Sequence, residues 1–166
     1  MKNLKPIFAL SALIMSLQDS HSSAQSSEKL FTHPHAKHRT VEATSEVEIA
    51  PDGSEVKILG RVPGIMSSIE CTFHPGSISK AAYHRTITEI WHVTEGEGYF
   101  YRKDLDSGAE SCVKITKGTT LTIPKETVFQ FKTIGDKPLK FFIATTPPWP
   151  GDDEAVFSKG RWKSTL

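Results

Sequence analysis

The chain has 166 residues and a formal net charge of +1, with 37% hydrophobic and 23% charged residues. This length suits one ordinary domain, and the composition is that of a globular chain rather than a disordered one. The basic residues form no stripe along the sequence, so the charge pattern does not favour nucleic-acid binding.

The N-terminus has the pattern of a secretory signal peptide. Lys2 and Lys5 form a short basic start, residues 7–17 form an apolar run, and the small residues 22–24 follow it. The apolar run is shorter than the roughly 20 residues that a membrane span needs. We therefore expect residues 1–24 to be removed on export, leaving a secreted or periplasmic protein with no membrane association.

Residues 25–45 are polar and show little apolar periodicity, which predicts a linker or arm. His33, His35 and His38 lie in this segment beside Pro34. Such a histidine pattern can bind a metal, but in a flexible, proline-containing stretch we expect a solvated tail.

The next segment, residues 46–146, alternates apolar and polar residues at a period of two, which is typical of β-strands. After the signal peptide no helical pattern of ten residues stands out. Many short strands joined by glycine and proline turns predict an all-β fold, either a closed barrel or two packed antiparallel sheets. The expected strands are residues 47–49, 56–58, 68–74, 87–93, 98–102, 113–115, 121–123, 128–132 and 139–143.

Two turns stand out between these strands. Pro51-Asp52-Gly53 is a turn signature between the first two strands. The Glu-Gly-Glu-Gly sequence at residues 95–98 offers the positive φ angles of a tight hairpin. Neither helix nor lysine follows it as in a P-loop, so it does not predict a phosphate site.

The C-terminal segment, residues 147–166, is expected to be irregular. Pro147, Pro148 and Pro150 oppose regular ladder pairing, and Trp149 and Trp162 need apolar cover. We expect a strap that packs across the barrel exterior or against a neighbouring subunit.

The two cysteines fall on different faces of their strands. Cys71 alternates with Ile69 and Phe73 on an apolar face, whereas Cys112 alternates with Lys114 on a polar one. An exported protein can form disulfides, but this pattern argues against a Cys71–Cys112 bond.

Two segments within the barrel region have a definite spacing. Five residues separate Gly76 from Ala82-Tyr83-His84, four more lead to Glu89, and a further six lead to Gly96. In the second segment, five residues separate Gly118 from Pro124. Three further positions of this segment matter for the comparison below: Glu126, Phe129 and Thr133.

This double spacing resembles the two motifs of the cupin superfamily, over roughly residues 56–146. The first family motif is glycine, five residues, His-x-His, three or four residues, glutamate, six residues and glycine. The second is glycine, five residues, Pro-x-Gly, two residues, histidine, three residues and asparagine. The resemblance implies a double-stranded β-helix, the cupin jelly-roll barrel, and a small single-domain protein that forms homodimers.

The resemblance also implies a metal site of three histidines and one carboxylate, from which this chain departs. His84 and Glu89 keep two of the four positions, but Ala82 and Phe129 replace the other two histidines. Stable sites generally offer three or four protein ligands, so we expect no tightly bound cofactor. A divalent metal would need a further ligand such as His74, which ends its strand before Pro75.

The preferred interpretation is a metal-free pocket in which His84 and Glu89 act as an acid–base pair. Tyr83, Trp91, Phe129 and Phe131 are the expected ligand-binding residues. Proton transfer by this pair would suit isomerase-, epimerase- or lyase-like chemistry on a small molecule. Two alternatives remain open: a metal-dependent oxygenase or lyase, and a non-catalytic binding or sensor protein. The His–Glu pair could also be only a buried structural hydrogen bond.

Overall fold

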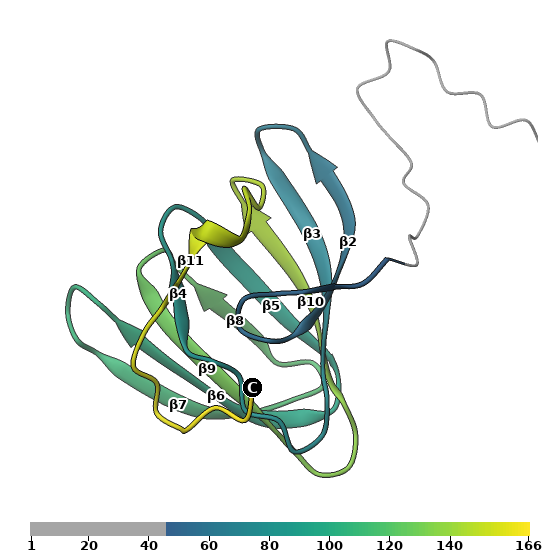
Figure 1. The fold of residues 1–166 in the computed structure, drawn as a ribbon, viewed down its shortest axis with the longest axis vertical. Coiled ribbons are helices and arrows are strands. Elements are labelled where there is room, and N and C mark those ends of the chain that lie inside the picture. Colours follow the sequence, from purple (N-terminus) through teal and green to yellow (C-terminus); the bar gives the residue numbers. More distant parts are fainter. Residues whose placement is uncertain (1–45) are drawn as a thin grey trace, which may run out of the picture. The chain divides into compact units, whose positions relative to one another are not determined.

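The computed structural model describes residues 46–166, and within them it contains strands, turns and one short 3-10 helix. The predicted signal peptide and polar arm, residues 1–45, lie outside this part of the chain. No helix of the described part is long and apolar enough to cross a membrane. The elements are shown in Figure 1: β1 (Glu48–Ile49), β2 (Glu55–Val62), β3 (Met66–Phe73), β4 (Ala82–His84), β5 (Thr88–Glu95), β6 (Glu97–Asp104), β7 (Glu110–Thr116), β8 (Thr120–Ile123), β9 (Thr127–Ile134), β10 (Leu139–Thr146), the 3-10 helix η1 (Asp152–Glu154) and β11 (Ala155–Phe157).

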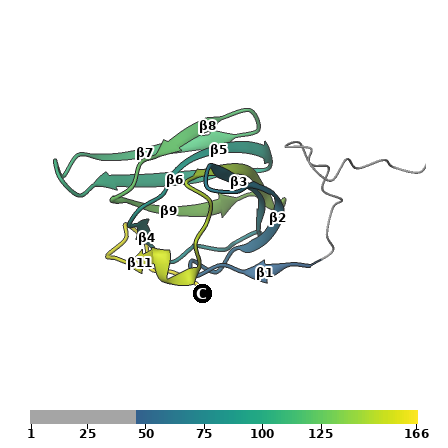
Figure 2. The same ribbon diagram turned by 90° about the horizontal axis from the view of Figure 1, so that it is seen from above.

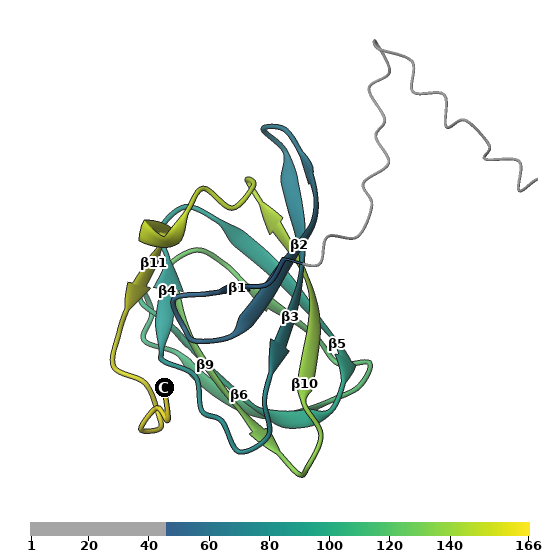
Figure 3. The ribbon, with the colours of Figure 1, turned by 45° about the vertical axis from the view of Figure 1, so that its right-hand side comes forward.

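The strands form two antiparallel sheets, which confirms the predicted all-β class. The six-stranded sheet has the order β1-β2-β3-β10-β5-β8, and the five-stranded sheet has the order β11-β4-β9-β6-β7. β1 and β2 form the predicted hairpin around residues 51–53. Figure 3 shows β1 crossing the opening between the two sheets.

The core lies between the sheets and consists of the apolar residues that alternate along the strands. Phe73, Phe100, Phe131 and Phe141 are all fully buried. Trp91 on β5 stands among them, with ring centroids between 4.9 and 5.5 Å from those of its aromatic neighbours. Burying each such side chain stabilises the fold by about 1.5–3 kcal/mol, so the period-two pattern explains most of the architecture.

Two strands were not predicted, and one of them corrects the expectation for the C-terminal segment. β4 and β11 are each too short to show a period of two. They pair with each other antiparallel, with Ala155 opposite His84 and Phe157 opposite Ala82. Figure 2 shows β11 lying along β4 at the edge of the five-stranded sheet. The ladder forms beyond the prolines, so they limit pairing only in residues 147–150.

The remainder of the strap packs across the outer face of the chain's own barrel, which is the first of the two arrangements predicted for it. Gln130 on β9 points away from the core, yet the strap buries it. Its amide accepts a hydrogen bond from Trp162 N and donates one to Trp162 O, both at 2.9 Å. A Cβ at Gly160 would collide with the Gln130 amide, so this close approach requires glycine.

The predicted hairpin at residues 95–98 is wrong. β5 belongs to the six-stranded sheet and β6 to the five-stranded sheet, so this turn carries the chain from one sheet to the other. Gly96 has a φ of 76°, and a Cβ there would collide with the Pro138 carbonyl. The glycine is thus needed both for backbone conformation and for close approach.

The cysteines are free and separated, as the alternation predicted. Cys71 is fully buried on β3, and Cys112 is exposed on β7. Burial, and then the nearby Asp52 carboxylate, raise the pKa of the Cys71 thiol far above its usual range. Cys71 is therefore an inert core residue.

Candidate functional site

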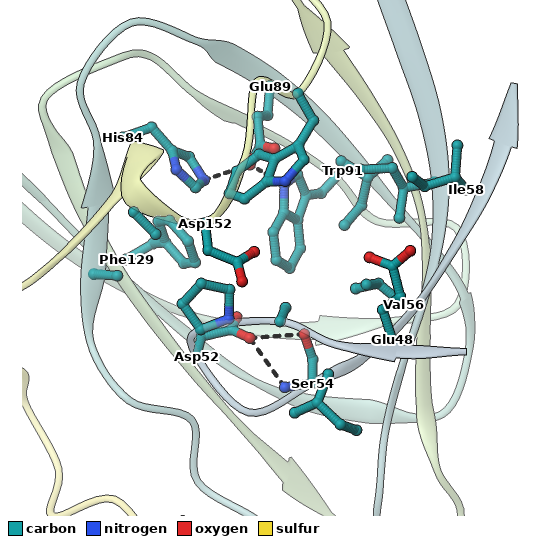
Figure 4. A pocket seen from close by; sticks show the side chains of 18 residues that line it. Glu48, Asp52, Ser54, Val56, Ile58, His84, Glu89, Trp91, Phe129 and Asp152 are labelled. Atoms are coloured by element: carbon teal, nitrogen blue, oxygen red, sulfur yellow. Dashed lines mark hydrogen bonds and ion pairs between the residues drawn. The ribbon is translucent and has the colours of Figure 1, made fainter. Parts of the chain in front are cut away.

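A cavity of about 70 Å³ opens at one end of the space between the sheets (Figure 4). Its walls are mostly apolar, and its polar groups come from β1, the turn after it, β4, β5 and η1. Such a cavity, with a few convergent polar groups, is the usual form of a small-molecule site. It is lined by Glu48, Ile49, Ala50, Pro51, Asp52, Ser54, Val56, Ile58, Ile69, Ala82, His84, Glu89, Trp91, Phe129, Ile143, Trp149, Asp152 and Ala155.

The central polar group is the Glu89 carboxylate, and one of its oxygens has two partners. His84 Nε2 lies 3.2 Å from Glu89 Oε2, and Trp91 Nε1 donates a hydrogen bond of 2.7 Å to the same oxygen. Glu89 and Trp91 share one face of β5 because they are two residues apart, while His84 comes from β4 in the other sheet. The structure therefore brings together the predicted acid–base pair and the predicted Trp91.

The His84 ring is held between aromatic side chains. Its centroid lies 5.1 Å from that of Phe129 and 5.4 Å from that of Trp149, whose ring meets it edge-on. Its Nε2 faces Glu89, and its Nδ1 lies on the other side of the ring. This Nδ1 is buried and has no hydrogen-bond partner within residues 46–166.

Asp52 is a second buried carboxyl in the cavity wall, and the sequence did not identify it as a site residue. Its Oδ1 accepts hydrogen bonds from Ser54 N at 3.0 Å and Ser54 Oγ at 2.7 Å. Burial raises the pKa of Asp52, and the Glu89 charge adds to this, while the Ser54 bonds and His84 oppose it. Pro51-Asp52-Gly53 predicted a turn correctly, but a turn pattern does not reveal that this turn folds over the cavity.

Glu154, in η1, fastens the strap beside the site. Its carboxylate accepts hydrogen bonds from Thr86 N, Ile87 N and Thr86 Oγ1. Burial opposes ionisation more than any single bond favours it, but the bonds together outweigh burial and lower the pKa of Glu154. The strap residues Trp149 and Asp152 can thereby contribute to the cavity wall.

Three residues predicted for the site lie outside the cavity wall. Tyr83 alternates away from its neighbours Ala82 and His84 and faces the other side of β4. Phe131 shares the face of Phe129 but lies farther along β9, fully buried in the core. His74 has a side chain that is 63% exposed, and it pairs with Glu55 at 2.8 Å rather than with His84 or Glu89.

The four positions of the family's metal ligands do converge. Ala82 lies directly opposite Phe129 across the β4–β9 ladder, and both line the cavity with His84 and Glu89. Only the last two carry donor atoms, and no group of three or more His, Cys, Asp or Glu residues in the described part is arranged to hold a metal. The donors present do not fit the three or four ligands of a stable protein site.

Comparison with known proteins gives the family. The cupin domain model matches residues 69–145. The chain is 30% identical to the uncharacterized protein MJ1618 of Methanocaldococcus jannaschii over an alignment of 112 residues. This alignment covers 65% of this chain and 85% of that protein. Together with the two-sheet barrel, these matches show that the chain belongs to the cupin family.

Solved structures show the same fold at low sequence identity. The capsular polysaccharide assembling protein CapF of Staphylococcus aureus aligns with a TM-score of 0.61 and 12% identity, over 73% of this chain and 33% of that one. Oxalate decarboxylase of Lactobacillus farciminis, in a formate complex, aligns with a TM-score of 0.57 and 17% identity, over 68% and 33%. Oxalate decarboxylase of Bacillus subtilis, in a structure from work on its Mn(II) centres, aligns with a TM-score of 0.51 and 22% identity, over 58% of this chain and 26% of that one. The chain thus spans about a third or less of the length of these structures.

Proposed function

We propose that this cupin binds a small molecule in its barrel and exchanges a proton with it through Glu89, without a metal. The supporting observation is the asymmetric environment of the Glu89 carboxylate. Its Oε2 is held by His84 and Trp91, while Oε1 has no hydrogen-bond partner among the described residues. A buried carboxylate with one fixed and one free oxygen is suited to accept a proton from a ligand in the cavity.

In this proposal the neighbouring side chains position the reacting groups. His84 shares a hydrogen with the carboxylate and stabilises its charge, and the Trp91 indole fixes its orientation. Phe129 and Trp149 form aromatic walls that orient a flat or apolar ligand and exclude water. Proton abstraction and return by such a group would produce an isomerase-, epimerase- or lyase-like reaction.

A metal-dependent oxygenase or lyase is the second candidate, because His84 and Glu89 occupy two of the family's ligand positions. Oxalate decarboxylase, which has the same fold, holds Mn(II) centres, so a divalent metal is the one to test here. A third candidate is a non-catalytic binding or sensor protein, which would need only the cavity and its aromatic walls.

We further propose that the protein acts after export, in the periplasm or outside the cell, as a homodimer. The basic start, apolar run and small residues of positions 1–24 support export. The resemblance to small cupins supports the dimer, which light scattering on the mature chain would test.

The decisive experiment compares Glu89→Gln and His84→Ala with a surface control, His92→Ala, whose exposed ring hydrogen-bonds to Thr120 and lies outside the cavity wall. A library of small metabolites would be screened for thermal shifts, and binders would then be incubated and analysed for products by mass spectrometry. We expect the control to bind and turn over a ligand, Glu89→Gln to bind without turnover, and His84→Ala to lose most of the rate. Turnover at the normal rate by Glu89→Gln would refute the catalytic role.

A further inference from the structure

The charged side chains that line the cavity are nearly all acidic. Glu48, Asp52, Glu89 and Asp152 carry carboxyl groups, and neither lysine nor arginine is among the lining residues of the described part. The remaining titratable group is His84, whose Nε2 is already paired with Glu89. An anionic ligand would therefore meet like charges in a low-dielectric site, whereas a cation would meet opposite ones.

Two of the acidic side chains are deeply buried, and each has an oxygen without a partner. Glu89 is 3% exposed and Asp52 is 6% exposed. Both hydrogen bonds to Asp52 use Oδ1, and both polar contacts of Glu89 use Oε2, which leaves Oδ2 and Oε1 unpartnered within residues 46–166. Neither oxygen is among the fully buried atoms without a partner in the described part, which are His84 Nδ1 and Arg102 Nε. Both carboxylate oxygens therefore keep accessible surface and can accept hydrogen bonds from a ligand that brings donors.

The two carboxyl groups lie on opposite sides of the cavity. Figure 4 shows Asp52 and Ser54 at one side, with His84 and Glu89 at the other. Between them lie the aromatic rings of Trp91 and Phe129, which attract cations through their faces and also accept apolar groups.

We propose that the ligand is a small organic cation whose ammonium group is bound by the Asp52 carboxylate and whose apolar body packs against Trp91 and Phe129. The proposal rests on the proposed function and names the substrate class of the same cavity. It places the ligand between a group that anchors its charge, Asp52, and the free oxygen of Glu89. An ammonium group carries N–H donors that form charge-assisted hydrogen bonds, and one of them can bind the unpartnered Asp52 Oδ2.

The size of the cavity limits the ligand. One ordered water occupies about 10–15 Å³ on the scale used for the cavity. A volume of about 70 Å³ therefore suits a ligand of only a few non-hydrogen atoms. Butylammonium, butanol and butyrate are probes of about this size that differ in charge.

Binding of the cation should also be coupled to loss of the proton from the Asp52 carboxyl group. Burial raises the pKa of Asp52, whereas a bound ammonium group would favour the carboxylate, so binding of the cation and ionisation of Asp52 favour each other. The titratable groups that face it are Glu48 on β1, Cys71 on β3, His84 on β4, Glu89 on β5 and Asp152 in η1. Of these, Cys71 stays neutral because its pKa is raised far above the usual range. The other carboxyl groups, where ionised, also attract a cation. Affinity for the cation should therefore rise with pH as Asp52 ionises.

The test measures binding of the three probes to the full chain by tryptophan fluorescence, since Trp91 and Trp149 both line the cavity. We expect butylammonium to bind at least about tenfold more tightly than butanol, which corresponds to about 1.4 kcal/mol, and butyrate to bind most weakly. Calorimetry in buffers of different ionisation enthalpy should show proton release with butylammonium alone.

The variant Asp52→Asn should lose at least about tenfold in butylammonium affinity, lose the proton release and keep its affinity for butanol. Asp106→Asn, in an exposed turn between β6 and β7, is the matched charge control and should behave as the parent protein does. Butyrate or butanol binding as tightly as butylammonium would overturn the cation proposal and leave the proposed binding function standing. Failure of all three probes to bind would overturn the cation proposal, whereas the metabolite screen with Glu89→Gln and His84→Ala decides the proposed function.

Discussion

At the scale of single residues, Glu126 shows how far this chain departs from its family's motif. The second cupin motif has glycine at this position, and here Glu126 has a φ of 60°. The left-handed conformation costs a residue with a Cβ about 1–2 kcal/mol. The turn keeps this conformation because Glu126 N donates to His84 O and Glu126 O accepts from Leu105 N. These are backbone bonds, so the glutamate side chain is not needed for them.

Glu126→Gly should therefore stabilise the protein by about 0.5–1 kcal/mol, because relief of the strained φ outweighs the greater freedom of glycine in the unfolded chain. Urea denaturation would measure the change. The neighbouring Lys125→Gly is the control: it gains the same freedom without relief of a positive φ, so it should be destabilising. A loss of stability in Glu126→Gly would show that the side chain contributes an interaction that outweighs the strain.

At the scale of elements, the period-two pattern located every strand of four or more residues, but not the short strands β4 and β11 beside the site. β4 has only three residues, and β11 is defined by its pairing with β4 rather than by its own sequence. Motif spacing pointed to His84, Glu89 and Phe129, and alternation along the strand pointed to Trp91. All four line the cavity. Asp52 also lines it, and neither pattern pointed to this residue. The side chain of a turn residue takes its place from how the turn folds over the barrel, which no local pattern encodes.

The fastening of the strap by Glu154 makes a prediction at this scale. Glu154→Gln should lower the free energy of unfolding by about 1–3 kcal/mol at neutral pH, because charge-assisted bonds to Thr86 and Ile87 are weakened. The folded-state pKa of Glu154 is lowered, so its contribution is fully present above the unfolded-state pKa, about 4.5. It is lost as pH falls through the lower folded-state pKa.

Denaturation of parent and variant at several pH values between 7 and about 3 would check this, with a difference that shrinks as pH falls below the unfolded-state pKa. The exposed neighbour Asp153 offers the control, since Asp153→Asn should change stability by no more than about 0.5 kcal/mol. A difference between parent and Glu154→Gln that stays constant down to the lowest pH would contradict a role for the charge.

At the scale of the whole molecule, the barrel brings the four motif positions to one cavity, but only two of them carry a side chain that can bind a metal. Positions 82 and 84 lie on β4, position 129 on β9 of the same sheet and position 89 on β5 of the other sheet, and all four line one cavity. The likeness to CapF and oxalate decarboxylase, at 12–22% identity, is a likeness of fold. One fold can host unrelated chemistries, so the activity of this cavity depends on the side chains that line it rather than on the barrel.

This dependence on the side chains can be tested by restoring the missing donors. The double variant Ala82→His with Phe129→His would present three imidazoles and one carboxylate, a set that suits manganese, iron or nickel. Because positions 82 and 129 are direct partners across β4 and β9, and Phe129→His frees some of the volume that Ala82→His fills, we expect the barrel to accept both. After exposure to Mn(II) and dialysis, elemental mass spectrometry should find about one equivalent per chain in the double variant and little in the parent.

The parent protein purified from an exporting host is the matched control for that experiment. About one equivalent of metal in the parent, lost in His84→Ala, would show that a ligand outside the family's positions completes the site, and the metal-dependent candidate would then take precedence. Little metal in the parent and a full equivalent in the double variant would show that Ala82 and Phe129 alone separate this cavity from a metal site. The proton chemistry of Glu89, and the charge preference set by Asp52, would then be the properties that distinguish this cupin from its metal-binding relatives.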